Sequence, residues 1–208
     1  MGNLPKMIRG WWNRHPREIA PQGTSGAKLS FVLESCDTDV RIFLRGEINR
    51  SAGPVLDQVL KSIQDSAIVF LNFHMVQGID SLGEGPWLWF VRRAAGRHTL
   101  VLEDLTPDVV RYLNLSGRFQ QHCRILSFLA DYFCPPCDAE YRHVYRTGSG
   151  PEEIGRDHRR QACTSCGGRL MLDGNAEEYF AFLGRQNSQA IPPSISSRDH
   201  PADSSEDD

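Results

Sequence analysis

Residues 67–73 read Ala-Ile-Val-Phe-Leu-Asn-Phe, an almost unbroken apolar run. A run of this length is typical of a strand that is buried on both faces, as the strands of parallel sheets are. Residues 98–102 form a second apolar run, while residues 28–34 and 40–45 alternate apolar and polar side chains on either side of a turn-prone segment. The alternating pair predicts a β-hairpin. We therefore expect a mixed sheet whose buried strands are covered by other elements.

Helical patterns separate these strands. Ser51 and Pro54 begin a segment with apolar residues at helical spacing, and a second helix follows residue 83. The sequence Thr-Pro-Asp at 106–108 combines an N-cap, an N1 proline and a first-turn acid. With a last strand at 123–129, the order is β-β-α-β-α-β-α-β. This order predicts the α/β class, a mixed β-sheet covered by helices.

Composition divides the chain of 208 residues, which has a net charge of −3, into four parts. We expect an irregular N-terminal segment, an α/β domain, a small cysteine-bearing domain and a disordered acidic tail, at residues 1–27, 28–129, 130–183 and 184–208. The two ends differ in charge, with +3 over residues 1–23 and −5 over residues 199–208.

The N-terminal sequence and the hydropathy pattern indicate the cellular compartment of the protein. The first residues show no apolar core followed by a small-residue cleavage site, which a secretory signal would have. No apolar run approaches the roughly 18 residues that a membrane-spanning helix needs. We therefore expect a cytoplasmic protein without a membrane partner.

Four of the six cysteines form two C-x2-C pairs, Cys134 with Cys137 and Cys163 with Cys166. Without a secretory signal, this spacing indicates a metal site rather than disulfides, and two facing copies disfavour a redox dithiol. Four thiolates complete a tetrahedron around Zn²⁺ and leave no open position, so we expect one structural zinc per chain in an arrangement that resembles a zinc ribbon. The two glycines after Cys166 permit a left-handed turn.

The two remaining cysteines, Cys36 and Cys123, stand alone beside strand-like segments. We expect both to be buried, unreactive thiols.

Because zinc ribbons often contact nucleic acid, the charge of this part matters. Residues 131–183 carry six arginines against nine acids, the opposite of what phosphate binding requires. The predicted polar loop 147–161 holds one basic patch, Arg156, Arg159 and Arg160. We therefore expect no nucleic-acid partner, and a nucleic-acid-associated zinc-ribbon protein that uses this patch and the basic N-terminus is the alternative.

A loop between a buried strand and a helix reads Gly-Ile-Asp-Ser-Leu-Gly at residues 78–83. Asp80 and Ser81 are suited to cap the helix. Alternatively, the helix N-terminus would stabilise a phosphate that is added to one of its first residues.

This topology, with Gly-Glu-Ile at 46–48 and Val-x-Gly-Ile-Asp-Ser-x-Gly at 76–83, resembles the STAS fold of bacterial anti-sigma-factor antagonists over residues 28–129. In that family the serine that follows the aspartate is phosphorylated by a partner kinase, the anti-sigma factor itself. The matching positions are Ser81 and Asp80. The family usually carries aspartate where this chain has Asn72.

The resemblance implies a non-enzymatic regulatory module for signalling and transcription control, which binds an anti-sigma-factor kinase or another signalling protein around Ser81. A STAS scaffold that works without phosphorylation is the alternative. No Ser-His-Asp set, phosphate-cradling glycine loop or HExxH sequence suggests an enzyme. Trp87, Trp89 and Phe90 cannot share one helix face, so at least one should contact a partner or residues 130–183.

Overall fold

The structure is a computed structural model that describes residues 28–36, 39–64, 66–116 and 120–185. The predictions for residues 1–27 and for residues 186–208 of the acidic tail lie outside these ranges. Among the described residues, no helix is both long enough and apolar enough to cross a membrane.

The larger of two sheets has the strand order β1-β2-β3-β4-β5 and contains the strands predicted from the apolar runs. The first two strands are antiparallel and the others are parallel. Its elements in chain order are β1 (Ser30–Cys36), β2 (Asp39–Ile48), the 3-10 turn η1 (Arg50–Ala52), α2 (Gly53–Ser62), β3 (Ile68–Ile79), α3 (Glu84–Ala95), β4 (Thr99–Glu103), α4 (Pro107–Ser116), η2 (Gln120–His122) and β5 (Arg124–Ile125). The predicted α/β class and element order are confirmed.

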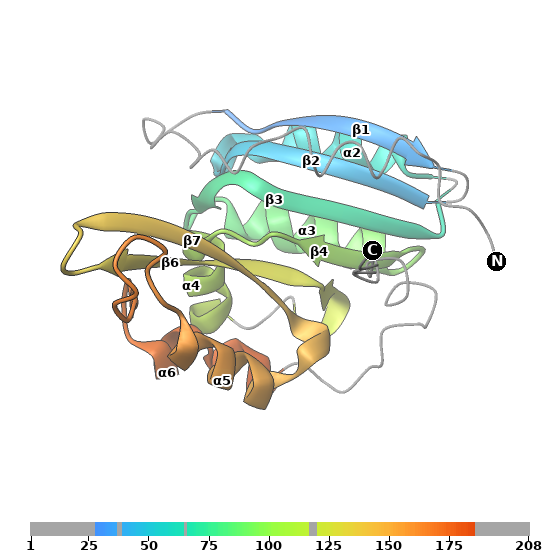
Figure 1. Ribbon diagram of the computed structural model, residues 1–208. Helices are drawn as coiled ribbons and strands as arrows, with labels where there is room; N and C mark the ends of the chain where they lie inside the picture. The colour runs from blue at the N-terminus through green and yellow to red at the C-terminus, as the bar shows by residue number, and fades with distance from the viewer. Residues whose placement is uncertain (1–27, 37–38, 65, 117–119, 186–208) are drawn as a thin grey trace, which may run out of the picture.

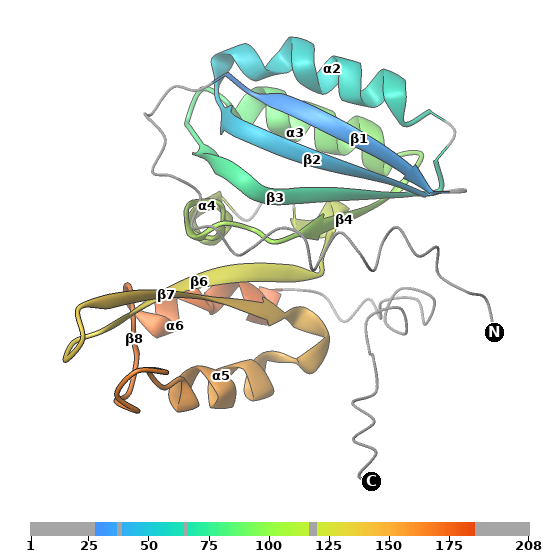
Figure 2. The same cartoon turned by 45° about the horizontal axis from the view of Figure 1, so that its top comes forward.

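The smaller sheet is antiparallel, with the order β7-β6-β8. Its elements are β6 (Ser127–Cys134), β7 (Ala139–Arg146), η3 (Thr147–Ser149), α5 (Pro151–Arg160), β8 (Met171–Leu172), α6 (Ala176–Tyr179) and η4 (Ala181–Arg185). Figures 1 and 2 show α2 and α3 on one face of the larger sheet and α5 beside the smaller sheet.

Two local predictions are wrong. The strand expected at 123–129 is broken at Leu126, whose N–H donates to the carbonyl of Leu102, so that β5 joins the larger sheet and β6 the smaller one. The segment 147–161, expected as a polar loop, contains α5. This helix starts with Pro151 and has acids in its first turn and basic residues in its last turn, which are ordinary helix signals.

One continuous apolar core joins the two sheets. Helix α4 packs against both β3 and β6, and it also contacts α6 and η4. Phe128 of β6 is fully buried and its ring contacts those of Tyr145, Tyr179 and Phe182. The boundary proposed between the two domains, after Leu129, therefore falls within a strand that packs on both sides.

Helix α3 divides its aromatic residues between the core and the surface, as the helical period requires. Trp87 and Phe90 are fully buried and stack on each other. Trp89 is 45% exposed, and the guanidinium of Arg93 lies 5.0 Å from its ring centre. One tryptophan of the three aromatic residues is thus presented on the surface.

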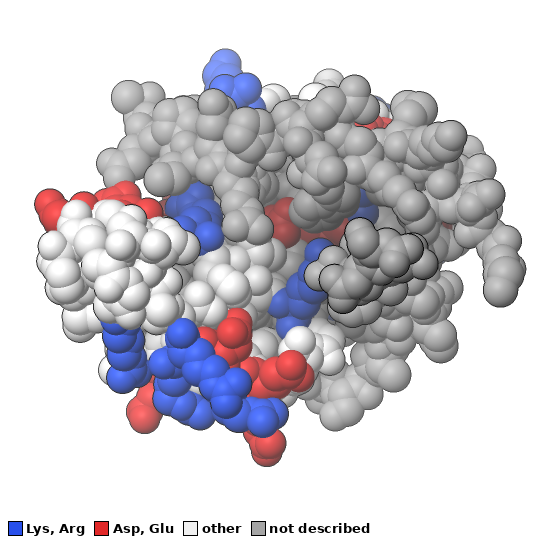
Figure 3. All heavy atoms as spheres, in the orientation of Figure 1, with Lys and Arg blue, Asp and Glu red and all other residues white. Residues whose placement is uncertain are grey.

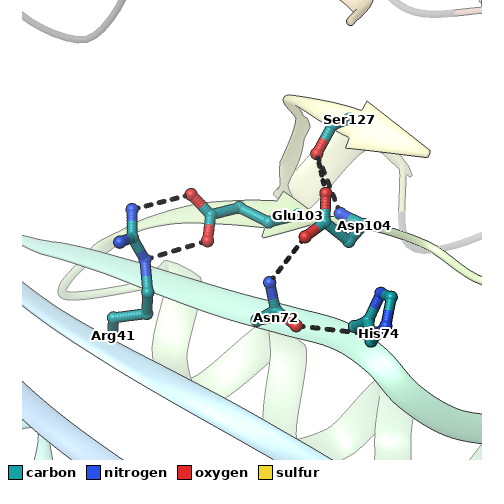
Figure 4. A network of polar contacts seen from close by, with 6 residues as sticks. All are labelled: Arg41, Asn72, His74, Glu103, Asp104 and Ser127. Carbon is teal, nitrogen blue, oxygen red and sulfur yellow. Dashed lines mark hydrogen bonds and ion pairs between the residues drawn. The ribbon is translucent and has the colours of Figure 1, made fainter. Parts of the chain in front are cut away.

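A buried polar cluster lies where the chain passes from one sheet to the other (Figure 4). The carboxylate of Asp104 accepts hydrogen bonds from Asn72 Nδ2 at 2.9 Å and from Ser127 Oγ at 2.7 Å, while the Asp104 N–H donates to Ser127 Oγ. Asp104 has a φ of 51°, which a non-glycine residue adopts at some cost. Beside the cluster, Arg41 and Glu103 form an ion pair with N–O distances of 3.0 Å.

This cluster explains why residue 72 is an asparagine here. The amide of Asn72 both donates to the Asp104 carboxylate and accepts from the N–H of His74, whereas an ionised aspartate could only accept. An aspartate at this position would bring a second carboxylate to a site in which Asn72 and Asp104 are both buried.

We expect Asn72→Asp to lower the free energy of unfolding by about 3 kcal/mol or more at pH 7, because a donor is replaced by an unpaired buried charge. The loss should shrink at acidic pH, since protonation of one carboxyl removes the repulsion and restores a donor. Urea melts at pH 7 and pH 4.5 would measure it. The matched control is Asn175→Asp at the N-cap of α6, where aspartate caps equally well and should change stability little. Equal effects at the two positions would contradict this account.

Candidate functional site

The Asp80–Ser81 loop is fixed to the end of β2. The N–H of Asp80 donates to the carbonyl of Ile48 at 3.1 Å. Asp80 Oδ1 accepts from the N–H groups of Leu82 at 2.9 Å and Gly83 at 2.6 Å. Asp80 therefore caps the turn that leads into α3. The side chain of Ser81 is exposed.

Gly83 is the residue that allows this close approach. A Cβ built at position 83 would lie 1.9 Å from the carbonyl oxygen of Ile48 and 2.8 Å from Cα of Asn49. These are backbone atoms, which cannot rotate away as a flexible side chain can. A side chain at position 83 would therefore push the loop off the end of β2.

The loop presents an apolar and acidic surface beside Ser81. Leu82 is 55% exposed, and Trp89, which is 45% exposed, lies in the second turn of α3. Asp80 and Glu84 flank the serine. A phosphate on Ser81 would not find the N–H groups of Leu82 and Gly83 free, because Asp80 already accepts from both. It would instead add negative charge to the exposed surface.

The second candidate site is the cluster of Cys134, Cys137, Cys163 and Cys166, which the structure brings together as the spacing predicted. All four Sγ atoms lie within 4.8 Å of one another. Two of the separations are 3.6 Å, between Cys134 and Cys166, and 3.8 Å, between Cys137 and Cys163. A disulfide requires about 2.05 Å, whereas a tetrahedral ion with Zn–S bonds of about 2.3 Å places its sulfur ligands about 3.8 Å apart. The donor set therefore fits a tetrahedral metal ion.

The two C-x2-C turns have the same backbone geometry. In the first, the N–H of Asp138 donates to the carbonyl of Cys134 at 2.8 Å. In the second, Gly167 donates to Cys163 at 2.8 Å. Both donors have a positive φ, 51° at Asp138 and 69° at Gly167. The expected left-handed glycine is thus present in one turn, and an aspartate takes its place in the other.

Tyr141 is a contact of the cluster that the sequence analysis missed. Its hydroxyl lies 3.0 Å from Cys163 Sγ. This hydrogen bond, together with the N–H of Cys166, lowers the pKa of Cys163 to about 5. The pKa values of Cys134 and Cys137 are raised, chiefly by burial at Cys134 and by the hydrogen bond with Cys166 at Cys137, so Cys163 is the member of the cluster that most readily forms a thiolate. Had β7 been predicted, its two-residue period would have placed Tyr141 on one face with Ala139 and His143.

The isolated cysteines are separate from this cluster. Cys123 is half-buried, and burial raises the pKa of its thiol, which agrees with an unreactive role. The side chain of Cys36 lies outside the described residues.

The chain was compared with protein families, curated proteins and solved structures. No family model matches, and no curated protein matches. Two similar structures are a candidate anti-sigma factor antagonist of Thermotoga maritima and an anti-sigma factor antagonist of Mycobacterium paratuberculosis. The first is 18% identical, covering 47% of this chain and 85% of the other, with a TM-score of 0.40. The second is 16% identical, covering 51% and 87%, with a TM-score of 0.41. Each likeness concerns about half of this chain, and neither assigns it a partner.

We expect Gly83→Ala to lower the free energy of unfolding by about 2–3 kcal/mol, because the new methyl group overlaps the carbonyl of Ile48. The matched control is Gly85→Ala, two residues further on in α3, where a Cβ meets nothing within 4 Å. There alanine should be neutral or stabilising by up to about 1 kcal/mol, owing to its higher helix propensity. Thermal melts of both variants test whether the loop needs the close approach of Gly83 to the backbone of Ile48. Similar melting temperatures would show that it does not.

Proposed function

We propose that this chain is a regulatory module that binds a protein partner through the Asp80–Ser81 loop and α3, and that phosphorylation of Ser81 switches the binding. The observation that carries the proposal is the contrast within the loop: its backbone is fixed to β2, while Ser81 and Leu82 point outward. A fixed loop presents its exposed groups at little cost in entropy when a partner binds. Leu82 and Trp89 offer the apolar anchors that protein interfaces use.

The resemblance of residues 76–83 to anti-sigma-factor antagonists supports a kinase that is itself an anti-sigma factor as the class of partner. Phosphorylation would act on the surface and leave the fold intact, because Asp80 satisfies the loop N–H groups with or without a phosphate. The added charge would stand beside Asp80 and Glu84 and make the surface strongly negative. A partner that buries Leu82 would then have to desolvate this charge.

We further propose that the four cysteines hold one structural Zn²⁺. A site with four thiolate ligands has no open position for a substrate, so the ion would stabilise residues 130–183 and take part in no reaction. The module would then act by binding alone. The cytoplasm is the compartment we propose, because free thiols persist there.

The zinc proposal predicts about one zinc per chain in freshly reduced protein, measured by elemental analysis. Cys134→Ser and Cys163→Ser should each lower this content to well under half. Cys123→Ser, which lies outside the cluster, should leave it unchanged. Chelation should expose β7, α5 and β8 to proteases, whereas residues 28–129 keep their own buried strands. Zinc content that is equally low in all four proteins would refute the site.

The docking proposal predicts that Ser81→Asp and Ser81→Glu abolish partner binding, while Ser81→Ala retains it. A photoreactive amino acid at Leu82 should cross-link the partner in cells of the source organism, and one at Val32, which is 63% exposed on β1, should not. Melting temperatures of the Ser81 variants should agree within about 2 °C, because the hydroxyl has no role in the cap. If Ser81→Asp gives the same adducts as Ser81→Ala, the switch is falsified.

A further inference from the structure

Helix α5 and the turn beside it expose a cluster of four arginines. Arg156, Arg159 and Arg160 lie on α5, and all three are exposed. Arg169 is also exposed, and it lies close to His158. Burial lowers the pKa of His158, and the positive charges of Arg169 and Arg159 lower it further. Figure 3 shows basic side chains gathered over this part of the molecule, with acidic side chains beside them. We call these four residues the arginine face.

The arginine face has no acidic partner among the residues that the structure describes. None of its four members forms one of the ion pairs found there. The acids of α5 have other positions or partners: Glu152 and Glu153 lie in its first turn, and Asp157, which stands between Arg156 and Arg159 in the sequence, pairs with His143 at 3.2 Å. Three like charges in the last two turns of α5 and a fourth on the turn beside it repel one another, so a covering anion would stabilise the arrangement.

We propose that the arginine face is covered by the acidic segment of this same chain, residues 199–208. That segment carries five acids, Asp199, Asp203, Glu206, Asp207 and Asp208, against the four arginines. The proposal is independent of the function of Ser81.

The chain between Arg185 and residue 199 is long enough for the acidic segment to reach the arginine face. The last described residue, Arg185, donates to the carbonyl of Asn114 in α4 at 3.0 Å, and five residues earlier the ring of Phe180 lies 5.2 Å from that of His158 on α5. Residue 199 is fourteen positions beyond Arg185. A chain of this length spans at most about 50 Å, several times the roughly 15 Å length of α5.

The covalent connection to residues 199–208 favours this segment over other anions at the arginine face. Individual exposed ion pairs are weak, so a free acidic peptide would bind poorly. A segment linked through a short connection acts at an effective concentration in the millimolar range and presents five carboxylates together, unlike a monovalent salt anion.

The test uses the intact chain and a zero-length carbodiimide, which joins a lysine amine to a carboxylate in contact with it. Arg159→Lys and Arg160→Lys keep the charge of the face and supply the amine. At 20 mM NaCl we expect amide links from these positions to residues 203–208, in monomeric protein, mapped by peptide mass spectrometry. At 0.5 M NaCl, where the screening length falls to roughly 4 Å, the yield should drop at least about five-fold.

Two exposed positions serve as controls, Arg97→Lys beyond α3 and Arg146→Lys on β7. Links from them to the acidic segment should be at least about five-fold rarer. Equal yields at all four positions, or a yield at 159 and 160 that does not respond to salt, would overturn the proposal.

A second measurement needs no change to the arginines. A dicarbonyl reagent modifies exposed guanidinium groups. The acidic segment is neutralised by four substitutions, Asp203→Asn, Glu206→Gln, Asp207→Asn and Asp208→Asn. They should raise the rate of modification of the arginine face about three-fold or more and leave the rate at Arg97 unchanged. An unchanged rate at the arginine face would contradict the proposal. The proposal would also be contradicted if duplex DNA protected these arginines equally well in the intact chain and in the neutralised chain. The arginine face would then be open to an external polyanion.

Discussion

The buried carboxylate of Asp104 is the contact on which the arrangement of the two sheets depends. It ties β3, through Asn72, to the first residue of β6, through Ser127. The backbone reinforces this tie, because the Leu105 N–H donates to Ser127 O and the Leu129 N–H to Leu105 O. Strand β6 is thereby fixed at its start. Cys134 is the last residue of β6. Both ribbon views show that β6 ends on the same side of the molecule as β2 and β3.

The sequence predicted the larger sheet well because its signals are local. A parallel strand that is buried on both faces must be apolar throughout, and 67–73 and 98–102 are. The break at Leu126 was not predictable in the same way. Residues 123–129 are apolar enough for one strand, and only the tertiary contacts of Asp104 and Leu105 decide that the second half joins another sheet. Local pattern therefore fixes which residues are buried, whereas buried polar contacts fix which sheet they enter.

The same distinction separates the two candidate sites. The cysteine site was predictable because C-x2-C is a local geometry, and each turn repeats one backbone hydrogen bond. Its partner Tyr141 was not, because its contact with Cys163 crosses between separate elements. In the serine loop, residue type suggested that Asp80 and Ser81 would share the cap. Asp80 alone accepts hydrogen bonds in the turn before α3, from the N–H groups of Leu82 and Gly83, and the N-cap of α3 itself, Gly83, has no side-chain cap.

Helix α5 shows why the cysteine site matters beyond its own ligands. A helix of ten residues is marginal in water, and α5 buries a single apolar residue, Ile154. Its position depends on the hydroxyl of Tyr132, which lies 2.9 Å from His158 Nδ1 and 2.6 Å from the hydroxyl of Tyr145, and on the pair of Asp157 with His143. The chain leaves α5 only three residues before Cys163, so the four-cysteine cluster fixes the helix at its C-terminal side. The position of the arginines on its outer surface therefore depends on the cysteine cluster as well as on these contacts.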